Sequence, residues 1–350
     1  MGVHRVLVIL SGVGGPIIAA PITFPTGYRV RIVLCFPVEP HHVEQIQQAA
    51  PDAEVINAGQ KGVATELLQA DIFCGHAKVP VDWEAVVSEG RLRWIQSSAA
   101  GMDHCLVPPV IESDIVVSSA SGLFANQVAE QTMALLFGFI RSMPIFYAAQ
   151  QKHEFVRRPT GELRGKRIGI VGFGGNGRRI AEVLAPYRCQ IVATDMFPHD
   201  KPDYVDKLWP ADQLDRLLRC VDIAILCIPL NDQTRSLIDA KCLGQMSAGS
   251  LLVNMARGQV VNEEDLIESL QSGHLGGAAL DVTQTEPLPT DSPLWDMQNV
   301  IITPHVGAQS ARRVGDTVDF FCQNFGRFQR GYAPLNLVDK RLGFPVPGSE

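Results

Sequence analysis

Residues 167–181 read Arg167-Ile168-Gly169-Ile170-Val171-Gly172-Phe173-Gly174-Gly175-Asn176-Gly177-Arg178-Arg179-Ile180-Ala181. A short apolar, β-branched run ends in Gly-x-Gly-x-x-Gly, and residues with helical spacing follow it. This order predicts a strand, a tight turn and a helix N-terminus, which together bind a pyrophosphate. Gly172 permits the turn, Gly174 lets backbone N–H groups approach the phosphates, and Gly177 lets the helix pack close to the strand.

A second strand and an acidic residue follow at the distance that a dinucleotide site requires. The run Gln190-Ile191-Val192-Ala193-Thr194-Asp195 predicts a strand with Asp195 at its C-terminal end. A carboxylate there hydrogen-bonds a ribose diol and repels a 2′-phosphate, so it favours NAD over NADP. A glycine triplet alone is weak evidence, but strand, triplet, helix and acid in this order make a strong motif.

Length, charge and cysteine usage limit the kind of protein. The chain has 350 residues, enough for two domains, with 46% hydrophobic and 19% charged residues. A net charge of −7 without a dense Lys/Arg stretch argues against a nucleic-acid or membrane surface. The eight cysteines are scattered and no C-x-x-C or H-E-x-x-H occurs, so we expect no disulfide framework, no metal site and a cytoplasmic location.

The N-terminal segment shares features with a signal segment and with a nucleotide loop, but departs from both. Residues 6–20 are apolar, yet glycines and Pro16 interrupt them, and the run is too short to span a bilayer. The glycines of residues 12–15 have no third glycine at the required spacing, and the prolines that follow prevent a long helix. We expect a buried strand over residues 5–10, followed by a loop.

Short apolar runs alternate with helical spacing ahead of the glycine motif. Strands are predicted at residues 29–36, 54–56, 70–74, 92–96 and 115–117, and a helix over 41–50. Alternation of this kind predicts a parallel sheet covered on both faces. It forms a first α/β domain that lacks a phosphate turn.

A run of small residues, Ser97-Ser98-Ala99-Ala100-Gly101, follows the strand predicted at 92–96. Ligands of open α/β sheets bind at the C-terminal ends of the strands, where small residues leave backbone N–H groups accessible. The run forms either a nest for a carboxylate or only a tight turn, and the sequence alone favours neither. His104 adjoins this run. Apart from His305, which is discussed below, it is the one histidine whose place in the sequence suggests a function.

A long apolar segment precedes the second domain. Residues 122–143 predict a helix that is buried between the two domains, with Ser121 as its N-cap and Pro144 ending or bending it. Further strands are predicted at 221–226, 250–254, 277–281 and 300–303. With the two strands of the dinucleotide motif they make a doubly wound sheet of six strands.

The chain then returns to the first domain. Residues 308–331 predict a final helix with apolar residues at helical spacing, and residues 340–350 are expected to form an extended arm.

Three polar residues stand at the C-terminal ends of successive predicted strands of the second domain: Arg257, Glu286 and His305. Singly, each has a structural explanation, because an arginine before glycine can cap a helix, a glutamate in a proline-containing loop is usually solvated, and a histidine after proline is often structural. Together they point to the place where a nicotinamide would lie, which favours a catalytic site.

The three residue types suit hydride transfer to the carbonyl of a 2-keto acid. The guanidinium of Arg257 can hold the carboxylate bidentately and polarise the carbonyl. His305 can donate a proton to the carbonyl oxygen and remove it in the reverse direction. Glu286 can orient His305 and favour its charged form.

On these motifs the sequence resembles the D-2-hydroxyacid dehydrogenase family, from about Arg31 to Arg341. The matching motifs are Gly172-x-Gly174-x-x-Gly177 with Asp195, Asn254-Met255-Ala256-Arg257-Gly258, Asp281-Val282 through Glu286-Pro287, and Thr303-Pro304-His305. Gly175-Asn176 replaces the more usual charged-then-aliphatic pair of the glycine turn.

The resemblance implies a role for each matching residue. Arg257, Glu286 and His305 are the catalytic trio, and Ala99, Ala100 and Gly101 hold the substrate carboxylate together with Arg257. The implied cofactor-binding residues are Gly172, Gly174, Gly175, Asn176, Gly177, Asp195, Ile228, Pro229, Thr234, Ala256, Asp281 and His305. Among them, Asp281 resembles the contact to the nicotinamide carboxamide.

The resemblance also implies the architecture and the reaction. We expect two doubly wound parallel-sheet domains, with a Rossmann NAD-binding domain at 122–308 inserted into a smaller flavodoxin-like substrate domain at 1–121 and 309–350. A homodimer built around the helix at Gly122 is implied as well.

The expected activity is NADH-dependent reduction of glyoxylate or hydroxypyruvate. Phosphoglycerate, lactate-like and branched 2-keto substrates remain open. The alternatives are an NAD(H)-sensing corepressor-like binding protein on the same fold and a related enzyme that oxidises an inorganic or one-carbon anion.

Overall fold

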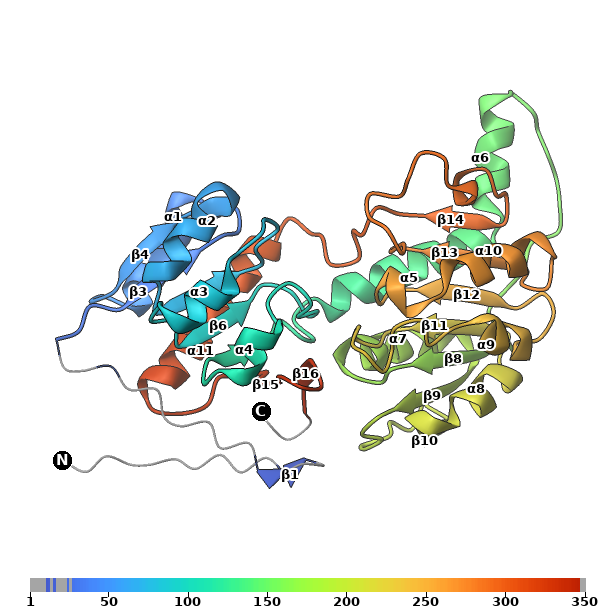
Figure 1. The fold of residues 1–350 in the computed structure, drawn as a ribbon. Coiled ribbons are helices and arrows are strands. Elements are labelled where there is room, and N and C mark those ends of the chain that lie inside the picture. Colours follow the sequence, from blue (N-terminus) through green and yellow to red (C-terminus); the bar gives the residue numbers. More distant parts are fainter. Residues whose placement is uncertain (1–10, 13–14, 17–23, 25–26, 347–350) are drawn as a thin grey trace. The chain divides into compact units, whose positions relative to one another are not determined.

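The computed structural model describes residues 11–12, 15–16, 24 and 27–346, and these form two compact units (Figure 1). Unit 1 comprises the described residues up to Leu123 together with those from Ser310, and unit 2 is Phe124–Gln309. The strand expected over residues 5–10 lies outside the described residues. The described part of the segment that follows it pairs Ser11–Gly12 (β1) antiparallel with Gly15–Pro16 (β2).

Unit 1 is built on a five-stranded parallel sheet in the order β4-β3-β5-β6-β7. The strands are β3 (Arg31–Leu34), β4 (Glu54–Asn57), β5 (Ile72–Gly75), β6 (Trp94–Ser97) and β7 (Val116–Ser118). The helices are α1 (Pro40–Ala49), α2 (Gly59–Glu66), α3 (Trp83–Ser88), α4 (Pro108–Glu112) and α11 (Arg313–Gln329), and a 3₁₀ turn, Leu67–Gln69, follows α2. This is the flavodoxin-like strand order, which confirms the predicted fold.

Helices cover both faces of this sheet, as its fully buried strands require. Apolar residues of α2, α3 and α4 pack on one face, and those of α1 and α11 pack on the other. The ring of Trp94 stacks between Phe321 and Phe328 of α11, with centroids 5.6 and 5.4 Å away. Asn324, fully buried on the same helix, donates to the side-chain oxygen of Gln96 at 2.7 Å. Helix α11 therefore fixes β6, whose C-terminal end carries the run of small residues.

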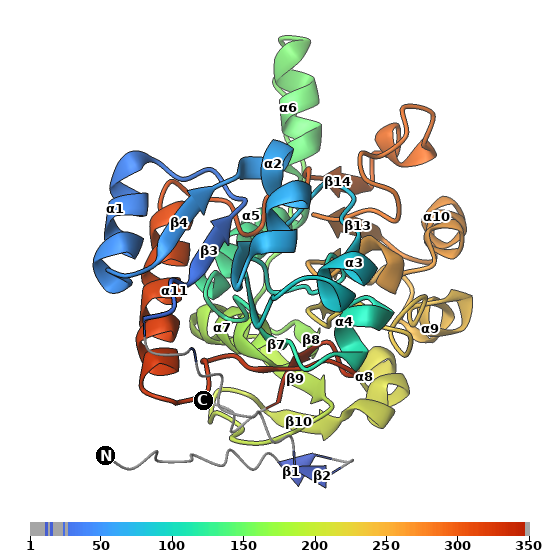
Figure 2. The ribbon, with the colours of Figure 1, turned by 60° about the vertical axis from the view of Figure 1, so that its left-hand side comes forward.

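Unit 2 contains a seven-stranded parallel sheet in the order β10-β9-β8-β11-β12-β13-β14 (Figures 1 and 2). The strands are β8 (Arg167–Val171), β9 (Gln190–Asp195), β10 (Lys207–Pro210), β11 (Ile223–Leu226), β12 (Leu251–Asn254), β13 (Gly277–Leu280) and β14 (Val300–Ile302). The order confirms the predicted Rossmann sheet. The prediction of six strands was wrong, because β10 forms a seventh strand at the edge.

Helices also cover both faces of the second sheet. One face carries α8 (Leu214–Cys220), α9 (Ala240–Gln245) and α10 (Glu263–Gln271), and the other carries α5 (Ala125–Ile140) and α7 (Gly175–Leu184). Short 3₁₀ turns lie at Ala185–Tyr187, Ala211–Gln213, Gly258–Val260 and Pro293–Trp295. Helix α6 (Met143–Gln151) stands away from the sheet of its own unit (Figures 1 and 2).

The long apolar segment is a helix that ends and bends next to Pro144 as expected, but its N-cap differs from the expectation. Ser121 is not its N-cap, because the helix begins at Ala125 and the N-cap position is held by Phe124, which makes no side-chain capping bond. Pro144 lies in the first turn of α6, and α5 and α6 meet at an angle of 67°. Among the described residues, no single helix is long and apolar enough to cross a membrane. Only the bent pair of α5 and α6, taken together, has that length and composition.

The C-terminal segment is not an extended arm as far as the structure describes it. Val338–Asp339 (β15) pairs antiparallel with Phe344–Pro345 (β16), and Gly343 takes a φ of +82° in the turn between them. Leu337 forms a bridge to Ser118 at the end of β7. Residues 337–345 therefore fold back as a hairpin beside the sheet of unit 1.

Candidate active site

The glycine turn of unit 2 has the geometry of a phosphate cradle. Gly172 takes a φ of +93°, and a Cβ there would lie 2.8 Å from the carbonyl oxygen of Cys227. At Gly177 a Cβ would lie 2.1 Å from the carbonyl oxygen of Gly172, so the helix approaches the turn closely. A Cβ on Gly174 would meet nothing within 4 Å, and Gly174 and Gly175 are exposed at the start of α7. The open N-terminus of a ten-residue helix suits the pyrophosphate of a dinucleotide.

Asp195 lies at the C-terminal end of β9, beside this turn. One carboxylate oxygen accepts from the backbone N–H of Phe173 at 2.6 Å, and the other accepts from that of Phe197 at 2.8 Å. Each oxygen keeps a second lone pair, so the half-buried carboxylate can still accept from a ribose hydroxyl. The ring of Phe173 is in turn covered by the guanidinium of Arg178, 4.9 Å from its centroid.

The loop after β11 packs against the same turn. A Cβ on Gly172 would also lie 2.8 Å from the side chain of Ile228. The hydroxyl of Thr234 donates to the carbonyl oxygen of Pro229 at 2.7 Å and accepts from the backbone N–H of Asn231 at 2.9 Å. Thr234 therefore holds the loop after β11 closed. The family resemblance implies that this loop borders the adenosine.

The side chain of Asn254 fixes the backbone at Arg257. The side chain of Asn254 at the end of β12 accepts from the N–H of Ala256 at 3.0 Å and donates to the carbonyl oxygen of Arg257 at 3.1 Å. A Cβ on the next residue, Gly258, would lie 1.8 Å from the carbonyl oxygen of Thr283. Only glycine permits this approach, which brings the loop carrying Arg257 against the loop carrying Glu286.

His305 and Glu286 form an ion pair at the same sheet edge. Nδ1 of His305 lies 2.8 Å from Oε2 of Glu286, and Oε1 of Glu286 accepts from the backbone N–H of Thr283 at 3.2 Å. The two side chains are 44% and 38% exposed, so the imidazole is accessible to a substrate. Because Nδ1 faces the carboxylate, Nε2 is the nitrogen left to exchange a proton.

Opposing effects set the pKa of Glu286. Burial raises it, whereas the hydrogen bond and positive charge of His305 lower it, together with the N–H of Thr283 and the charge of Arg257. The lowering effects win, and the pKa of Glu286 lies below its ordinary value of 4.5. The carboxylate is therefore ionised at neutral pH and stabilises an imidazolium at His305.

Asp281 organises the loop that carries His305. Its Oδ1 accepts from the hydroxyl of Thr303 at 2.6 Å and from the N–H of Val306 at 3.0 Å, and its Oδ2 accepts from the N–H of Gly307 at 2.8 Å. The N–H of His305 donates to the carbonyl oxygen of Asp281 at 2.8 Å. His305 has a φ of +54°, a strained conformation for a non-glycine residue, and these bonds hold it there.

The run of small residues in unit 1 leaves two amides available. The N–H of Ala99 donates to the hydroxyl of Ser97 at 3.1 Å, and the carbonyl oxygen of Ala99 accepts from Ala120 at 3.0 Å. Within the described residues, the N–H groups of Ala100 and Gly101 have no protein acceptor, and Ala100 is exposed. Of the three residues expected to bind a carboxylate, Ala100 and Gly101 therefore have backbone N–H groups that are available to donate.

The structure brings the sequence-predicted residues of unit 2 to one sheet edge. The cofactor candidates and the catalytic candidates follow the C-terminal ends of β8, β9, β11, β12, β13 and β14. The sequence did not predict that Asn254 supports the Arg257 loop or that Thr303 bonds Asp281. The available signal was that both residues lie at strand ends close to a candidate residue. Among the described residues no group of three or more His, Cys, Asp or Glu side chains could hold a metal ion.

Four of the eight cysteines are buried and the other four are partly buried. All eight are unpaired with one another, and three of them are fully or almost fully buried at Cys35, Cys74 and Cys105. Burial raises the pKa of the Cys35 and Cys227 thiols to about 12. These thiols stay protonated at neutral pH, so they are poor nucleophiles.

Comparison with known proteins gives consistent similarities. The profile of the family described as "D-isomer specific 2-hydroxyacid dehydrogenase, NAD binding domain" matches residues 133–307. The (S)-sulfolactate dehydrogenase of Chromohalobacter salexigens is 37% identical over 65% of this chain and 74% of that protein. The glyoxylate reductase of Thermofilum pendens is 30% identical over 75% of this chain and 79% of that protein.

A solved structure shares the fold of nearly the whole chain. It is the NADPH-dependent glyoxylate/hydroxypyruvate reductase from Sinorhizobium meliloti, in complex with NADP and sulfate. The two chains align with a TM-score of 0.78 and 27% identity, over 90% of this chain and 100% of the other.

Proposed function

Because this chain belongs to the D-isomer-specific 2-hydroxyacid dehydrogenase family, we propose that it reduces a small 2-keto acid to its D-2-hydroxy acid with NADH. The chain is an oxidoreductase that uses a nicotinamide dinucleotide. Glyoxylate and hydroxypyruvate are the proposed substrates. The observation that carries the proposal is the 2.8 Å contact between His305 and Glu286 at the sheet edge that bears the glycine turn.

The proposed roles follow from the groups that each residue presents. The bound reduced nicotinamide supplies the hydride. Arg257 of unit 2 binds the substrate carboxylate and polarises the carbonyl. Ala100 and Gly101 of unit 1 offer backbone N–H groups that suit a carboxylate. His305, charged through Glu286, donates the proton at Nε2 to the carbonyl oxygen and takes it back in the reverse reaction.

We propose that the dinucleotide lies along the C-terminal edge of the sheet of unit 2. Gly172 and the N–H groups from Gly174 to Gly177 would hold its pyrophosphate. Ile228, Pro229 and Thr234 would border the adenosine. Ala256, Asp281 and His305 would border the nicotinamide.

The charge of Asp195 supports NADH over NADPH. A 2′-phosphate at the adenosine ribose would be repelled by the carboxylate, which a ribose diol would instead approach as a donor. The solved relative binds NADP, so the preference of this chain needs its own measurement. We expect kcat/KM for NADH to exceed that for NADPH, and the reverse order would contradict the role of Asp195.

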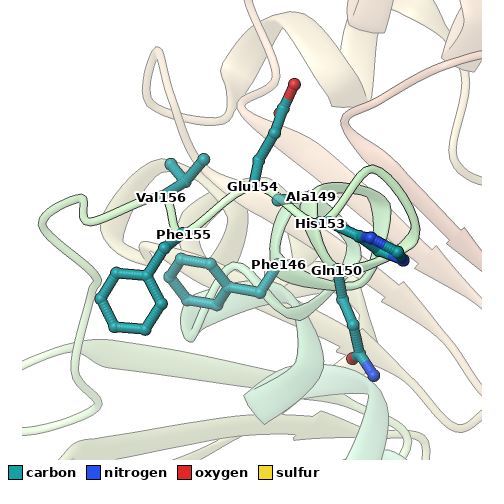
Figure 3. A pocket seen from close by; sticks show the side chains of 7 residues that line it. All are labelled: Phe146, Ala149, Gln150, His153, Glu154, Phe155 and Val156. Atoms are coloured by element: carbon teal, nitrogen blue, oxygen red, sulfur yellow. The ribbon is translucent and has the colours of Figure 1, made fainter.

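A homodimer is proposed from the surface of unit 2. Phe155 is 89% exposed, Tyr147 59% and Val156 43%, all on or next to α6. A pocket of about 350 Å³ lies there, lined by Phe146, Ala149, Gln150, His153, Glu154, Phe155 and Val156 (Figure 3). Exposed aromatic residues around a pocket are typical of an interface with another chain.

The proposal is tested by following NADH oxidation with glyoxylate, hydroxypyruvate and pyruvate. Turnover of at least one of them is expected. Tight NADH binding without turnover on a broad panel of 2-keto acids would defeat the proposal and favour an NAD(H)-sensing binding protein. The variant His305→Gln is the matched control for background NADH oxidation, because it retains the glycine turn and lacks the proposed acid.

A further inference from the structure

The loop that carries Glu286 is anchored to the first turn of α10. Glu263 is the first residue of this helix, and its Oε2 accepts from the backbone N–H of Gln284 at 2.8 Å. The side-chain oxygen of Gln284 accepts from the backbone N–H of Glu263 at 3.3 Å. The two residues therefore exchange a pair of hydrogen bonds, each from the backbone of one to the side chain of the other.

A third bond ties this pair to the loop that carries Arg257. The side chain of Gln259, two residues after Arg257, donates to the carbonyl oxygen of Gln284 at 2.8 Å. The N–H, the carbonyl oxygen and the side-chain oxygen of Gln284 are thus each bonded to residues 259–263. Gln284 itself is exposed, and exposed loop residues are usually the mobile part of a chain. The three bonds therefore fix a turn that burial does not hold.

This turn carries groups that act on the proposed acid. Thr283 donates its N–H to Oε1 of Glu286 at 3.2 Å, and its hydroxyl donates to the carbonyl oxygen of Thr285 at 2.9 Å. Oε2 of Glu286 lies 2.8 Å from Nδ1 of His305. A displacement of Gln284 would therefore move both the N–H that orients the carboxylate and the carboxylate that faces the imidazole.

The charged groups that face Glu286 come from two other loops. Burial raises the pKa of Glu286, whereas His305, from the loop after β14, and Arg257, from the loop after β12, lower it. The attraction between these charges falls with distance. The position of Glu286 therefore decides how strongly its carboxylate stabilises an imidazolium at His305.

We propose that Glu263 is a positioning residue of the active site, which holds Gln284 and thereby the turn at residues 283–286. The turn keeps the carboxylate of Glu286 against His305. This inference rests on the proposed reductase function, and it adds a residue that acts on the reaction only through Glu286.

The test compares variants of the full-length enzyme with the wild-type protein. Glu263→Ala removes the acceptor of the Gln284 N–H, whereas Glu263→Gln keeps a side-chain oxygen that can accept it. Glu264→Ala is the matched control, because Glu264 is an exposed acid in the same first turn of α10 and has the same relation to the helix dipole. If Glu263→Ala unfolds, Gln284→Ala replaces it, because that change removes only the bond to the N–H of Glu263.

The kinetic result is expected to separate kcat from KM. Glu263→Ala should lower kcat with the best 2-keto acid by about 3- to 10-fold, the size of one or two lost hydrogen bonds. The KM for NADH should stay unchanged, because the glycine turn is left intact. The alkaline limb of the kcat/KM profile should move to lower pH, because the imidazolium loses part of its stabilisation. Glu263→Gln should restore both values, and Glu264→Ala should leave them unchanged.

A spectroscopic measurement tests the positioning role without turnover. Nitrogen NMR shifts of the His305 ring, assigned by their loss in His305→Gln, report the contact between Nδ1 and Glu286. At neutral pH these shifts should change in Glu263→Ala and return to the wild-type values in Glu263→Gln.

The outcomes separate the two proposals. Absence of turnover in the wild-type protein would overturn the reductase function, and the ring shifts would still decide the positioning role. Turnover with the same ring shifts and the same pH profile in Glu263→Ala would overturn the positioning role alone. Equal losses in Glu263→Ala and Glu263→Gln would also overturn it, since the hydrogen bond would then not be the cause.

Discussion

At the residue scale, the proposed reaction depends on one imidazole. Nδ1 of His305 faces Glu286 at 2.8 Å, so we propose that Nε2 serves the substrate. We expect His305→Gln to lower kcat by about 10²- to 10⁴-fold, the usual contribution of a general acid. Stopped-flow and steady-state assays of NADH oxidation measure the loss. His274→Gln is the control, because His274 lies 3.1 Å from the carbonyl oxygen of Leu243, where the ring has a structural role.

Binding of the cofactor should survive this change. His305 is proposed to border only the nicotinamide, and the glycine turn and Asp195 do not contact it in the described structure. The affinity for NADH, measured by fluorescence titration, is therefore expected to fall far less than kcat. Retained turnover in His305→Gln would assign proton transfer to another group.

We propose that Glu286 controls the pH range of the reaction. Its pKa lies below 4.5, so the carboxylate stays ionised from neutral pH down to that value and the pair with His305 persists. Glu286→Gln removes the negative charge that stabilises the imidazolium. We expect the alkaline limb of the kcat/KM profile for reduction to move to lower pH. An unchanged limb would mean that the proton comes from elsewhere.

At the element scale, Gly258 joins the loops that carry Arg257 and Glu286. A Cβ there would lie 1.8 Å from a backbone carbonyl oxygen, which cannot move aside as a flexible side chain can. We expect Gly258→Ala to destabilise the protein by about 1–3 kcal/mol, the usual cost of overpacking, and to lower kcat/KM. Thermal unfolding and kinetics measure both effects.

A second glycine provides the matched control for this change. Gly244 lies within α9, and a Cβ there would meet nothing within 4 Å. Gly244→Ala is therefore expected to leave activity unchanged and to stabilise the helix by roughly 0.5–1 kcal/mol. Equal effects of the two substitutions would contradict the close contact at Gly258.

Strand ends could be predicted from the sequence, but the loops between them could not. Arg257, Glu286 and His305 were expected at one edge because parallel strands align their C-terminal ends. The bonds from Asp281 to Val306 and Gly307 depend on the path of the loop, which no periodicity in the sequence encodes. The contact between Gly258 and Thr283 could not be predicted either, because Gly258 has no positive φ and so does not mark a turn.

The missed strand and the misjudged tail have a similar origin. Lys207–Pro210 is short, is bounded by a proline and lacks the apolar run of a central strand, because an edge strand has one neighbour and partial exposure. The hairpin of β15 and β16 consists of two-residue strands, which are too short for an alternating pattern. The one feature of the sequence that indicated a turn in this hairpin was Gly343.

At the scale of the whole molecule, the two sheets follow from the alternation of strands and helices, whereas the proposed dimer depends on an exposed surface. The alternation of apolar runs with helical spacing predicted both parallel sheets, since buried strands read as continuous apolar runs. The exposure of Phe155 and Tyr147 could not be predicted in this way, because an aromatic residue beside a helix usually enters a core. Helix α6 stands away from the sheet of its own unit (Figure 2). Tyr147 lies on this helix, and Phe155 lies just beyond its end.

The last prediction therefore concerns the oligomeric state. If α6 and residues 152–156 form the dimer interface, replacing Phe155, which is 89% exposed, by aspartate places a charge where an apolar side chain would be buried. We expect the wild-type protein to be a dimer by light scattering and Phe155→Asp to shift it towards the monomer. Tyr332→Asp is the control, because Tyr332 is 49% exposed but belongs to unit 1. A wild-type monomer at micromolar concentration would contradict the proposed dimer. A dimer that resists Phe155→Asp combined with Tyr147→Asp would place the interface elsewhere.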